Sequence, residues 1–260
     1  MSTLLRSLEH TFRHRVVYPT LRMALHNPSV ALPIELGSVR RILLLRYDRL
    51  GDVVVTSSFV QRLRQLAPSL FIGMLTSTTN QPAAALLEGI DVFHVIGGSL
   101  AETGRAIRSA RAHQYDVVLN LVFNRTTSGG VLANLIAPRG IKVGQGAEKY
   151  RFYFNALLTL ERETRHMAEI ISSIGEQVFG PGFDTTHRPY SLVDDPASVQ
   201  RVELFLALCA PGPIIVNASA GSRSRQPTFA QLRGLISAVR MRTQKTIIVT
   251  SAPGQESLRE

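Results

Sequence analysis

The chain has 260 residues, of which 45% are hydrophobic and 18% are charged. This length allows one large domain or two small ones, and the composition excludes a disordered, collagenous or low-complexity protein. The 29 basic residues outnumber the 19 acidic residues and give a net charge of +10, which indicates an anionic partner: nucleic acid, a phospholipid surface or a phosphorylated substrate. A single cysteine, Cys209, excludes an intrachain disulfide and a cluster of thiolate metal ligands.

The N-terminal segment carries no targeting signal that the residues reveal. No apolar run reaches the length of about 18 residues that a transmembrane helix needs, and charged residues and histidines from Glu9 to Arg15 leave no room for a signal peptide. We therefore expect a cytoplasmic protein.

Residues 1–38 are predicted to form an N-terminal extension. Apolar residues recur there at helical spacing, with arginines beside them; the apolar positions are Leu4, Leu5, Leu8, Phe12, Val16, Leu21, Met23 and Leu25. A basic amphipathic helix of this kind can lie on an anionic membrane surface, and it can equally pack on its own domain. The sequence leaves both alternatives open.

From residue 39 the pattern changes to alternating strands and helices, which is typical of a parallel sheet with helices on both faces. We predict a Rossmann-like domain over residues 39–182. The expected strands are 41–46, 70–75, 91–96, 115–122 and 140–144, and the expected helices are 53–66, 82–87, 100–113, 127–136 and 164–179.

A second αβ pattern begins after a turn-rich connection. Residues 183–210 are predicted to be an interdomain linker with one helix, and the pattern restarts at Pro211. A strand over 214–217, a helix over 229–242 and a strand over 246–250 then follow. Because two strands and one helix make a poor independent sheet, we expect residues 211–260 to be an incomplete second Rossmann-like domain.

The turn after the first strand, Arg46-Tyr47-Asp48-Arg49-Leu50-Gly51-Asp52-Val53, has the residues and the position of a functional site. Sites in open parallel sheets lie at the carboxyl ends of the strands. Gly51 allows a tight turn or a close approach to a ligand, and Asp52 is expected at a helix N-terminus, where it could act as a general base toward a hydroxyl group. The alternative is an ordinary capping aspartate. The glycines of the dinucleotide fingerprint are absent.

This turn and three later segments resemble glycosyltransferase family 9, the ADP-heptose:lipopolysaccharide heptosyltransferases. The first strand followed by Asp-Arg-Leu-Gly-Asp resembles the opening of that family, and it is the most specific of the four matches. The others are Tyr115–Leu121 with Arg125 and Ser128, Arg165–Glu169, and Val216–Ser222 with Arg225. The resemblance covers about residues 39–256.

The resemblance implies a GT-B fold of two Rossmann-like domains, with residues 39–182 on the acceptor side and the incomplete domain 211–260 on the donor side. It also implies inverting transfer from a nucleotide sugar, ADP-heptose, without a metal ion or cofactor. It assigns the catalytic base to Asp52. It places Gly51, Gly221, Ser222 and Arg225 on the donor, and Arg49 and Arg125 on a phosphorylated lipid A-core acceptor. Arg125 and Arg225 could instead be solvated surface cations, and Ser222 an ordinary turn residue. Peripheral contact with the cytoplasmic face of the inner membrane is expected, and a nucleic-acid partner is not.

The sequence also departs from the family pattern. Asn120 stands where an aspartate is common, and Gln226-Pro227 replaces an aromatic-proline pair. The Gly-Pro-x-His-x-Ala segment that helps to hold the donor is absent. These departures support an alternative in which the chain is a C-terminally truncated, inactive remnant or a binding module that recognises an anionic glycolipid or a protein partner.

Overall fold

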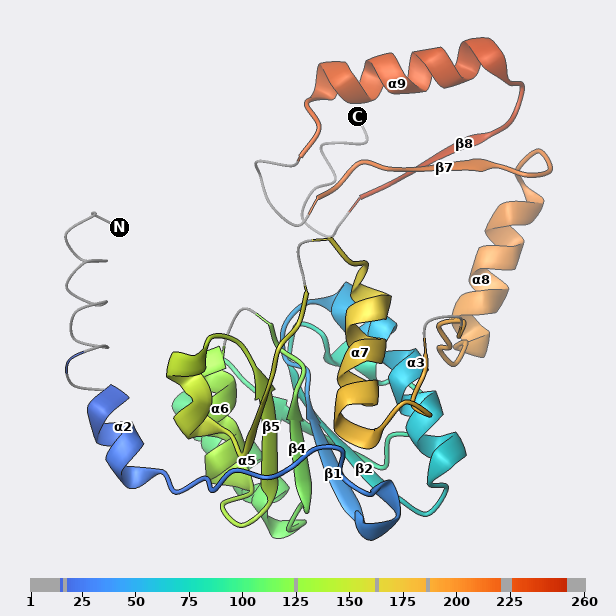
Figure 1. The fold of residues 1–260 in the computed structure, drawn as a ribbon. Helices are drawn as coiled ribbons and strands as arrows, with labels where there is room; N and C mark the ends of the chain where they lie inside the picture. The colour runs from blue at the N-terminus through green and yellow to red at the C-terminus, as the bar shows by residue number, and fades with distance from the viewer. Residues whose placement is uncertain are drawn as a thin grey trace. The chain divides into compact units, whose positions relative to one another are not determined.

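The computed structural model describes residues 15, 18–123, 126–161, 164–185, 188–220 and 226–251. The chain divides into two compact units, residues 1–193 and residues 194–260 (Figure 1). The larger unit holds a six-stranded sheet, and the smaller unit holds a two-stranded sheet.

The strands of the larger sheet are all parallel and are ordered β3-β2-β1-β4-β5-β6. They comprise β1 (Arg41–Leu45), β2 (Phe71–Ser77), β3 (Val92–Ile96), β4 (Val117–Asn120), β5 (Ile141–Gln145) and β6 (Ala156–Leu158). The five predicted strands are therefore confirmed. The sequence did not predict β6, because a strand of three residues is too short to produce a readable hydrophobic pattern.

Helices cover both faces of this sheet (Figure 1). Helices α3 (Leu50–Leu66), α4 (Gln81–Ala84) and α7 (Met167–Phe179) supply the core that contains Ile42 and Leu44 of β1. Helices α5 (Leu100–Ala112) and α6 (Thr126–Ile136) supply the core that contains Leu43 and Leu45. Successive strand residues point to opposite faces, so an apolar β1 buries side chains on both sides. The predicted doubly covered α/β architecture is confirmed.

Two helix starts differ by three residues from the sequence prediction, and both differences come from the cap. Helix α3 begins at Leu50 rather than at Val53, because Arg49 adopts the extended N-cap conformation. Asp52 is thus a first-turn residue and not the cap. Helix α7 begins at Met167, because the His166 side chain accepts a hydrogen bond from the backbone N–H of Ala168.

The end of the N-terminal extension packs on its own unit. Tyr18, the first residue of α2 (Tyr18–Ala24), is 9% exposed. Its ring contacts Tyr150 and Phe152, which both belong to the 3-10 helix η3 (Glu148–Tyr153). Further along, Asn155 donates from Nδ2 to the carbonyl of Pro28. Short 3-10 helix η2 (Leu36–Ser38) then leads into β1. The earlier apolar positions of the expected amphipathic helix, Leu4 to Val16, lie outside the described residues.

The smaller unit contains a parallel pair of strands and two helices. Strands β7 (Ile214–Asn217) and β8 (Ile247–Thr250) pair in parallel, and they are joined through α9 (Phe229–Arg242), after α8 (Pro196–Ala207). The described core consists of Val216, Ala218 and Leu232. A capping box between Thr228 and Gln231 fixes the start of α9, as the sequence predicted.

The seven histidines are scattered through the sequence without metal-ligand spacing, which predicts surface or capping positions for most of them, and His94 is an exception. His94 in the middle of β3 is 2% exposed, and it lies 2.8 Å by Nε2 from the Tyr115 hydroxyl and 3.2 Å by Nδ1 from Ser109 Oγ. His94 is buried because the side of β3 that carries it faces α5. His166, in contrast, caps α7.

Candidate active site at the end of the first strand

The first turn lies at the topological switch point of the sheet. Strand β1 pairs with β2 on one side and with β4 on the other, with Leu45 opposite Leu75 and Asn120. The chain leaves β1 into α3 on one face of the sheet and leaves β4 into α6 on the other face. In open α/β sheets, ligands bind in the crevice outside such strand ends. Residues 46–52 are therefore positioned where the fold accommodates a ligand.

The guanidinium of Arg46 ties the elements around this crevice together. Arg46 is fully buried, and its Nε donates to the carbonyl of Asp52 and to Thr56 Oγ1, both at 3.0 Å. Its Nη1 donates to the carbonyl of Leu121, directly after β4. Burial lowers the pKa of Arg46, whereas the carboxylates of Asp48 and Asp52 act in the opposite direction. One cation thus joins the end of β1, the first turn of α3 and the end of β4.

A second carboxyl group lies beside Asp52. Asp48 Oδ2 is 3.3 Å from Arg46 Nη1, and the Asp48 side chain is 15% exposed. Burial raises the pKa of Asp48, the Arg46 guanidinium opposes this shift, and the side chain of Asp52 adds to it. Among the described residues, Asp48 Oδ1 and Arg46 Nη2 are buried without a hydrogen-bond partner. Such orphaned polar atoms are rare, and they are groups that a bound polar ligand could satisfy.

Asp52 occupies the first turn of α3 and is partly exposed. Its backbone carbonyl accepts from Arg46 and from Thr56 Oγ1, at 2.7 Å for the latter, so its position is fixed through the main chain. A partly exposed carboxylate on a fixed backbone has the accessibility and the fixed position that a general base requires.

Gly51 and Arg49 flank this carboxylate on the exposed side of the turn. Gly51 is a helical residue without positive φ, so it does not serve the tight turn that was one expectation. A Cβ at Gly51 would meet nothing within 4 Å; the expected close approach of a ligand stays a prediction. Arg49 is exposed and forms the N-cap without a side-chain cap bond. Its predicted acceptor contact likewise stays a prediction.

Four predicted site residues, Arg125, Gly221, Ser222 and Arg225, lie outside the described residues. The structure does describe both sides of the 221–225 segment. Gln226 Oε1 accepts from the N–H of Ala220 at 3.0 Å, and its Nε2 donates to the carbonyl of Ala218 at 2.9 Å. The glutamine that departs from the family pattern therefore makes hydrogen bonds to residues 218 and 220, which an aromatic side chain could not make.

Asn120 has a packing role at the end of β4. It is 3% exposed, and its Oδ1 accepts from the N–H of Val122 at 3.2 Å. A Cβ at Gly129 would overlap the Asn120 side chain, so the glycine lets α6 approach the strand closely. Among the described residues, Asn120 Nδ2 is buried without a hydrogen-bond partner.

Sequence reasoning singled out Asp52 but assigned no role to Arg46 or Asp48. Asn80 was also missed: its Nδ2 donates to the carbonyl of Arg46 at 2.8 Å, and its Oδ1 accepts from the N–H of Ser77 at 2.9 Å. One signal was present in the sequence, namely a charged residue placed directly after a strand of apolar residues. The groups that contact Arg46 come from other elements: they lie in the first turns of α3, directly after β4 and shortly after β2.

Two further observations concern the described residues only. No group of three or more His, Cys, Asp or Glu side chains is arranged there to hold a metal ion. None of the helices that the structure describes combines the length and the apolar character needed to cross a bilayer.

The fold is that of a doubly wound α/β protein with a parallel sheet, and comparison with solved structures narrows it further. The chain is similar to a family 9 glycosyl transferase from Veillonella parvula, with TM-score 0.62, 18% identity and coverage of 88% of this chain and 72% of that one. E. coli ADP-heptose lps heptosyltransferase II gives TM-score 0.61, 14% identity and coverage of 84% and 66%. E. coli heptosyltransferase WaaC, solved with ADP-2-deoxy-2-fluoro heptose, gives TM-score 0.55, 14% identity and coverage of 84% and 71%.

These likenesses confirm the fold that the sequence motifs predicted, that of family 9 glycosyltransferases. The chain spans 66% to 72% of the length of these three proteins. No protein-family model matches the sequence, and no curated protein matches it.

Proposed function

We propose that the chain is an inverting glycosyltransferase of family 9 that acts on a nucleotide sugar without a metal ion. The observation that carries this proposal is Asp52 in the first turn of α3, held at the switch point by the buried Arg46 beside Asp48. The shared fold supports the reaction class, since the neighbouring structures include a heptosyltransferase solved with ADP and with an ADP-heptose analogue.

In the proposed reaction, Asp52 takes the proton of an acceptor hydroxyl while the hydroxyl oxygen attacks the anomeric carbon of the donor. The bond between that carbon and the diphosphate oxygen breaks, and the nucleoside diphosphate leaves with the electron pair. Attack from the face opposite the leaving group inverts the configuration. The Arg46 guanidinium supports Asp52 through the main-chain carbonyl and neutralises Asp48, so that two carboxyl groups can lie together.

The substrates follow from the family resemblance. We propose ADP-heptose as the donor, contacted by Gly51, Gly221, Ser222 and Arg225, and a phosphorylated lipid A core as the acceptor, contacted by Arg49 and Arg125. Guanidinium groups suit both, because they bind phosphate oxygens through paired hydrogen bonds. A protein with this acceptor would work in the cytoplasm, at the inner membrane surface.

The test is a transfer assay with ADP-heptose and a heptose-deficient core acceptor, followed by release of ADP. We expect Asp52→Asn to lower the turnover rate by about 100-fold or more, because general base catalysis contributes about 10²–10⁴-fold. Glu88→Gln, an exposed carboxylate between α4 and β3, is the matched control and should leave the rate unchanged. A wild-type rate in Asp52→Asn would exclude Asp52 as the base.

The alternative of a non-catalytic binding module makes a different prediction in the same preparation. Such a module would bind the phosphorylated acceptor and would neither bind ADP nor release it from ADP-heptose. Calorimetric titration with ADP and with the acceptor therefore separates the two, and saturable ADP binding by the wild-type chain supports the transferase.

A further inference from the structure

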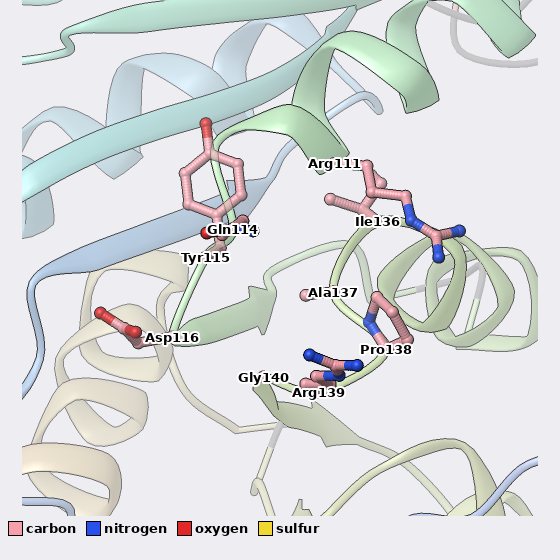
Figure 2. A pocket seen from close by; sticks show the side chains of 9 residues that line it. All are labelled: Arg111, Gln114, Tyr115, Asp116, Ile136, Ala137, Pro138, Arg139 and Gly140. Carbon is pink, nitrogen blue, oxygen red and sulfur yellow. The ribbon is translucent and has the colours of Figure 1, made fainter.

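A cavity of about 500 Å³ lies where strands β4 and β5 of the larger sheet begin, at the end of the sheet opposite the candidate active site (Figure 2). Its lining comes from the carboxyl ends of α5 and α6 and from the residues that enter β4 and β5, including Asp116 and Gly140. All strands of this sheet run parallel, so their amino ends are separated from the crevice at residues 46–52 by the length of the strands. The cavity is therefore distinct from the site that the proposed function uses.

Two arginines of this cavity have no anionic partner in the part of the chain that the structure describes. Arg111 is in the last turn of α5, and Arg139 is in the turn between α6 and β5; both side chains are exposed. In the view of Figure 2, Pro138 lies between their guanidinium groups. Among the described residues, neither guanidinium takes part in a hydrogen bond or an ion pair. These charges are available to a ligand.

The acidic residue at this cavity is already engaged. Asp116 Oδ2 accepts hydrogen bonds from the backbone N–H groups of Arg40 and Arg41, both at 2.9 Å. Asp116 therefore fixes the entry into β1 rather than neutralising Arg111 or Arg139. The local balance of charge is positive.

The carboxyl ends of α5 and α6 would by themselves disfavour an anion, but other cations cover them. Arg41 Nη1 donates to the carbonyl of His113 at 2.7 Å, after the end of α5. The buried Lys142 donates from Nζ to the carbonyls of Ala137 at 3.3 Å and Pro138 at 3.2 Å, after the end of α6. The negative ends of both helices are thus compensated without the use of Arg111 or Arg139.

The remaining lining suits a small polar molecule with an apolar part. Ile136, Ala137 and Pro138 form an apolar wall. Gln114 supplies an amide, and it is held at φ 52°, where glycine would be the easier residue. A volume of about 500 Å³ is within the range of small-molecule sites.

We propose that this cavity binds the phosphate group of a small phosphorylated molecule, with Arg111 and Arg139 as its two ligands and Gln114 beside them. A phosphate dianion can accept hydrogen bonds from two guanidinium groups at once, which a single carboxylate does less well. The phosphate could belong to a free metabolite or to a lipid headgroup.

The test is titration of the complete chain with inorganic pyrophosphate in a phosphate-free buffer, followed by calorimetry. We expect Arg111→Gln and Arg139→Gln each to weaken binding about tenfold and the double variant about a hundredfold, since each removes charge-assisted hydrogen bonds. Arg108→Gln is the matched control: it is exposed on α5 one turn earlier and does not line the cavity. The affinity of this variant should stay within about twofold of wild type, because an exposed charge outside the cavity contributes little.

A diphosphate could also occupy a donor site, so the second readout is local. In amide-resolved NMR, pyrophosphate should shift the signals of Gln114 and Gly140, and these shifts should persist in Asp52→Asn. Unchanged affinity in the double variant, or shifts absent from both amides, would overturn the proposal. Vesicles with and without phosphatidic acid distinguish the sources: binding of the vesicles that depends on Arg111 and Arg139 identifies a lipid headgroup, and pyrophosphate binding alone identifies a soluble ligand.

Discussion

The buried histidine of β3 makes the stability of the larger unit depend on pH. His94 is 2% exposed and bonded to Tyr115 and Ser109, with the ring of His113 5.3 Å away. Burial, with a smaller contribution from His113, lowers its pKa from 6.5 to about 4. The folded chain therefore keeps His94 neutral at a pH where the unfolded chain has already protonated it.

The sign and the size of the effect follow from these two values. Since the unfolded state binds the proton more readily, stability is fully present above pH 6.5 and is lost as the pH falls toward 4. Between pH 7.5 and 4.5 the loss from this one group is about 2.5 kcal/mol, at about 1.36 kcal/mol per pH unit. The carboxylates that also titrate in this range are common to the wild type and to a His94 variant, so they cancel in the difference.

The assay is urea unfolding of the wild type and of His94→Gln at pH 7.5 and pH 4.5. Gln keeps an amide near the Tyr115 hydroxyl but cannot take up a proton. We expect the free energy of unfolding of the wild type to fall by about 2.5 kcal/mol more than that of His94→Gln over this interval. His26→Gln, at an exposed position, is the control and should follow the wild type. If the difference in the free energy of unfolding between wild type and His94→Gln is the same at both pH values, the lowered pKa of His94 is refuted.

Two further predictions concern packing and the buried cation, and both are measured as changes in the free energy of urea unfolding. Arg46→Met removes the partner of a buried carboxyl group and should destabilise the chain by about 3–5 kcal/mol. Arg165→Met at the surface is the control and should cost below about 0.5 kcal/mol. Similar losses of stability in the two variants would contradict the role given to Arg46. Gly175→Ala places a Cβ against the ring of Phe183 and should destabilise by about 1–3 kcal/mol, while Gly104→Ala, with nothing within 4 Å, should stabilise by up to about 1 kcal/mol. Stabilisation by both alanines would show that the contact at α7 relaxes freely.

Most of the fold could be predicted from the sequence, because local pattern and tertiary burial agree. The apolar run 42–45 indicates a strand buried on both faces, and β1 is one of the two central strands of the larger sheet. Strand β6 could not be predicted in this way. Its place depends on pairing with β5, where Val143 lies opposite Ala156, and on no periodicity of its own.

The candidate site was predictable in position but not in its electrostatics. The βα pattern of the sequence indicated that Asp52 follows the carboxyl end of a strand. The strand order, which the structure supplies, makes this end the switch point of the sheet. The burial of Arg46 and its bond to the carbonyl of Leu121 depend on the register of β4 beside β1, which no local pattern encodes. The raised pKa of Asp48 follows from the same burial and from Asp52. Chemistry at this turn therefore depends on contacts distant in sequence.

The hydrogen bond between Asn155 and Pro28 has a consequence for the order in which the chain folds during synthesis. The two residues are 127 positions apart, and translation at about 5–20 residues per second separates their appearance by roughly 6–25 s. Over that interval the segment around Pro28 has left the ribosome before its docking site on η3 and β6 exists. It is thus a late-docking element, available to chaperones and proteases until β6 has joined the sheet.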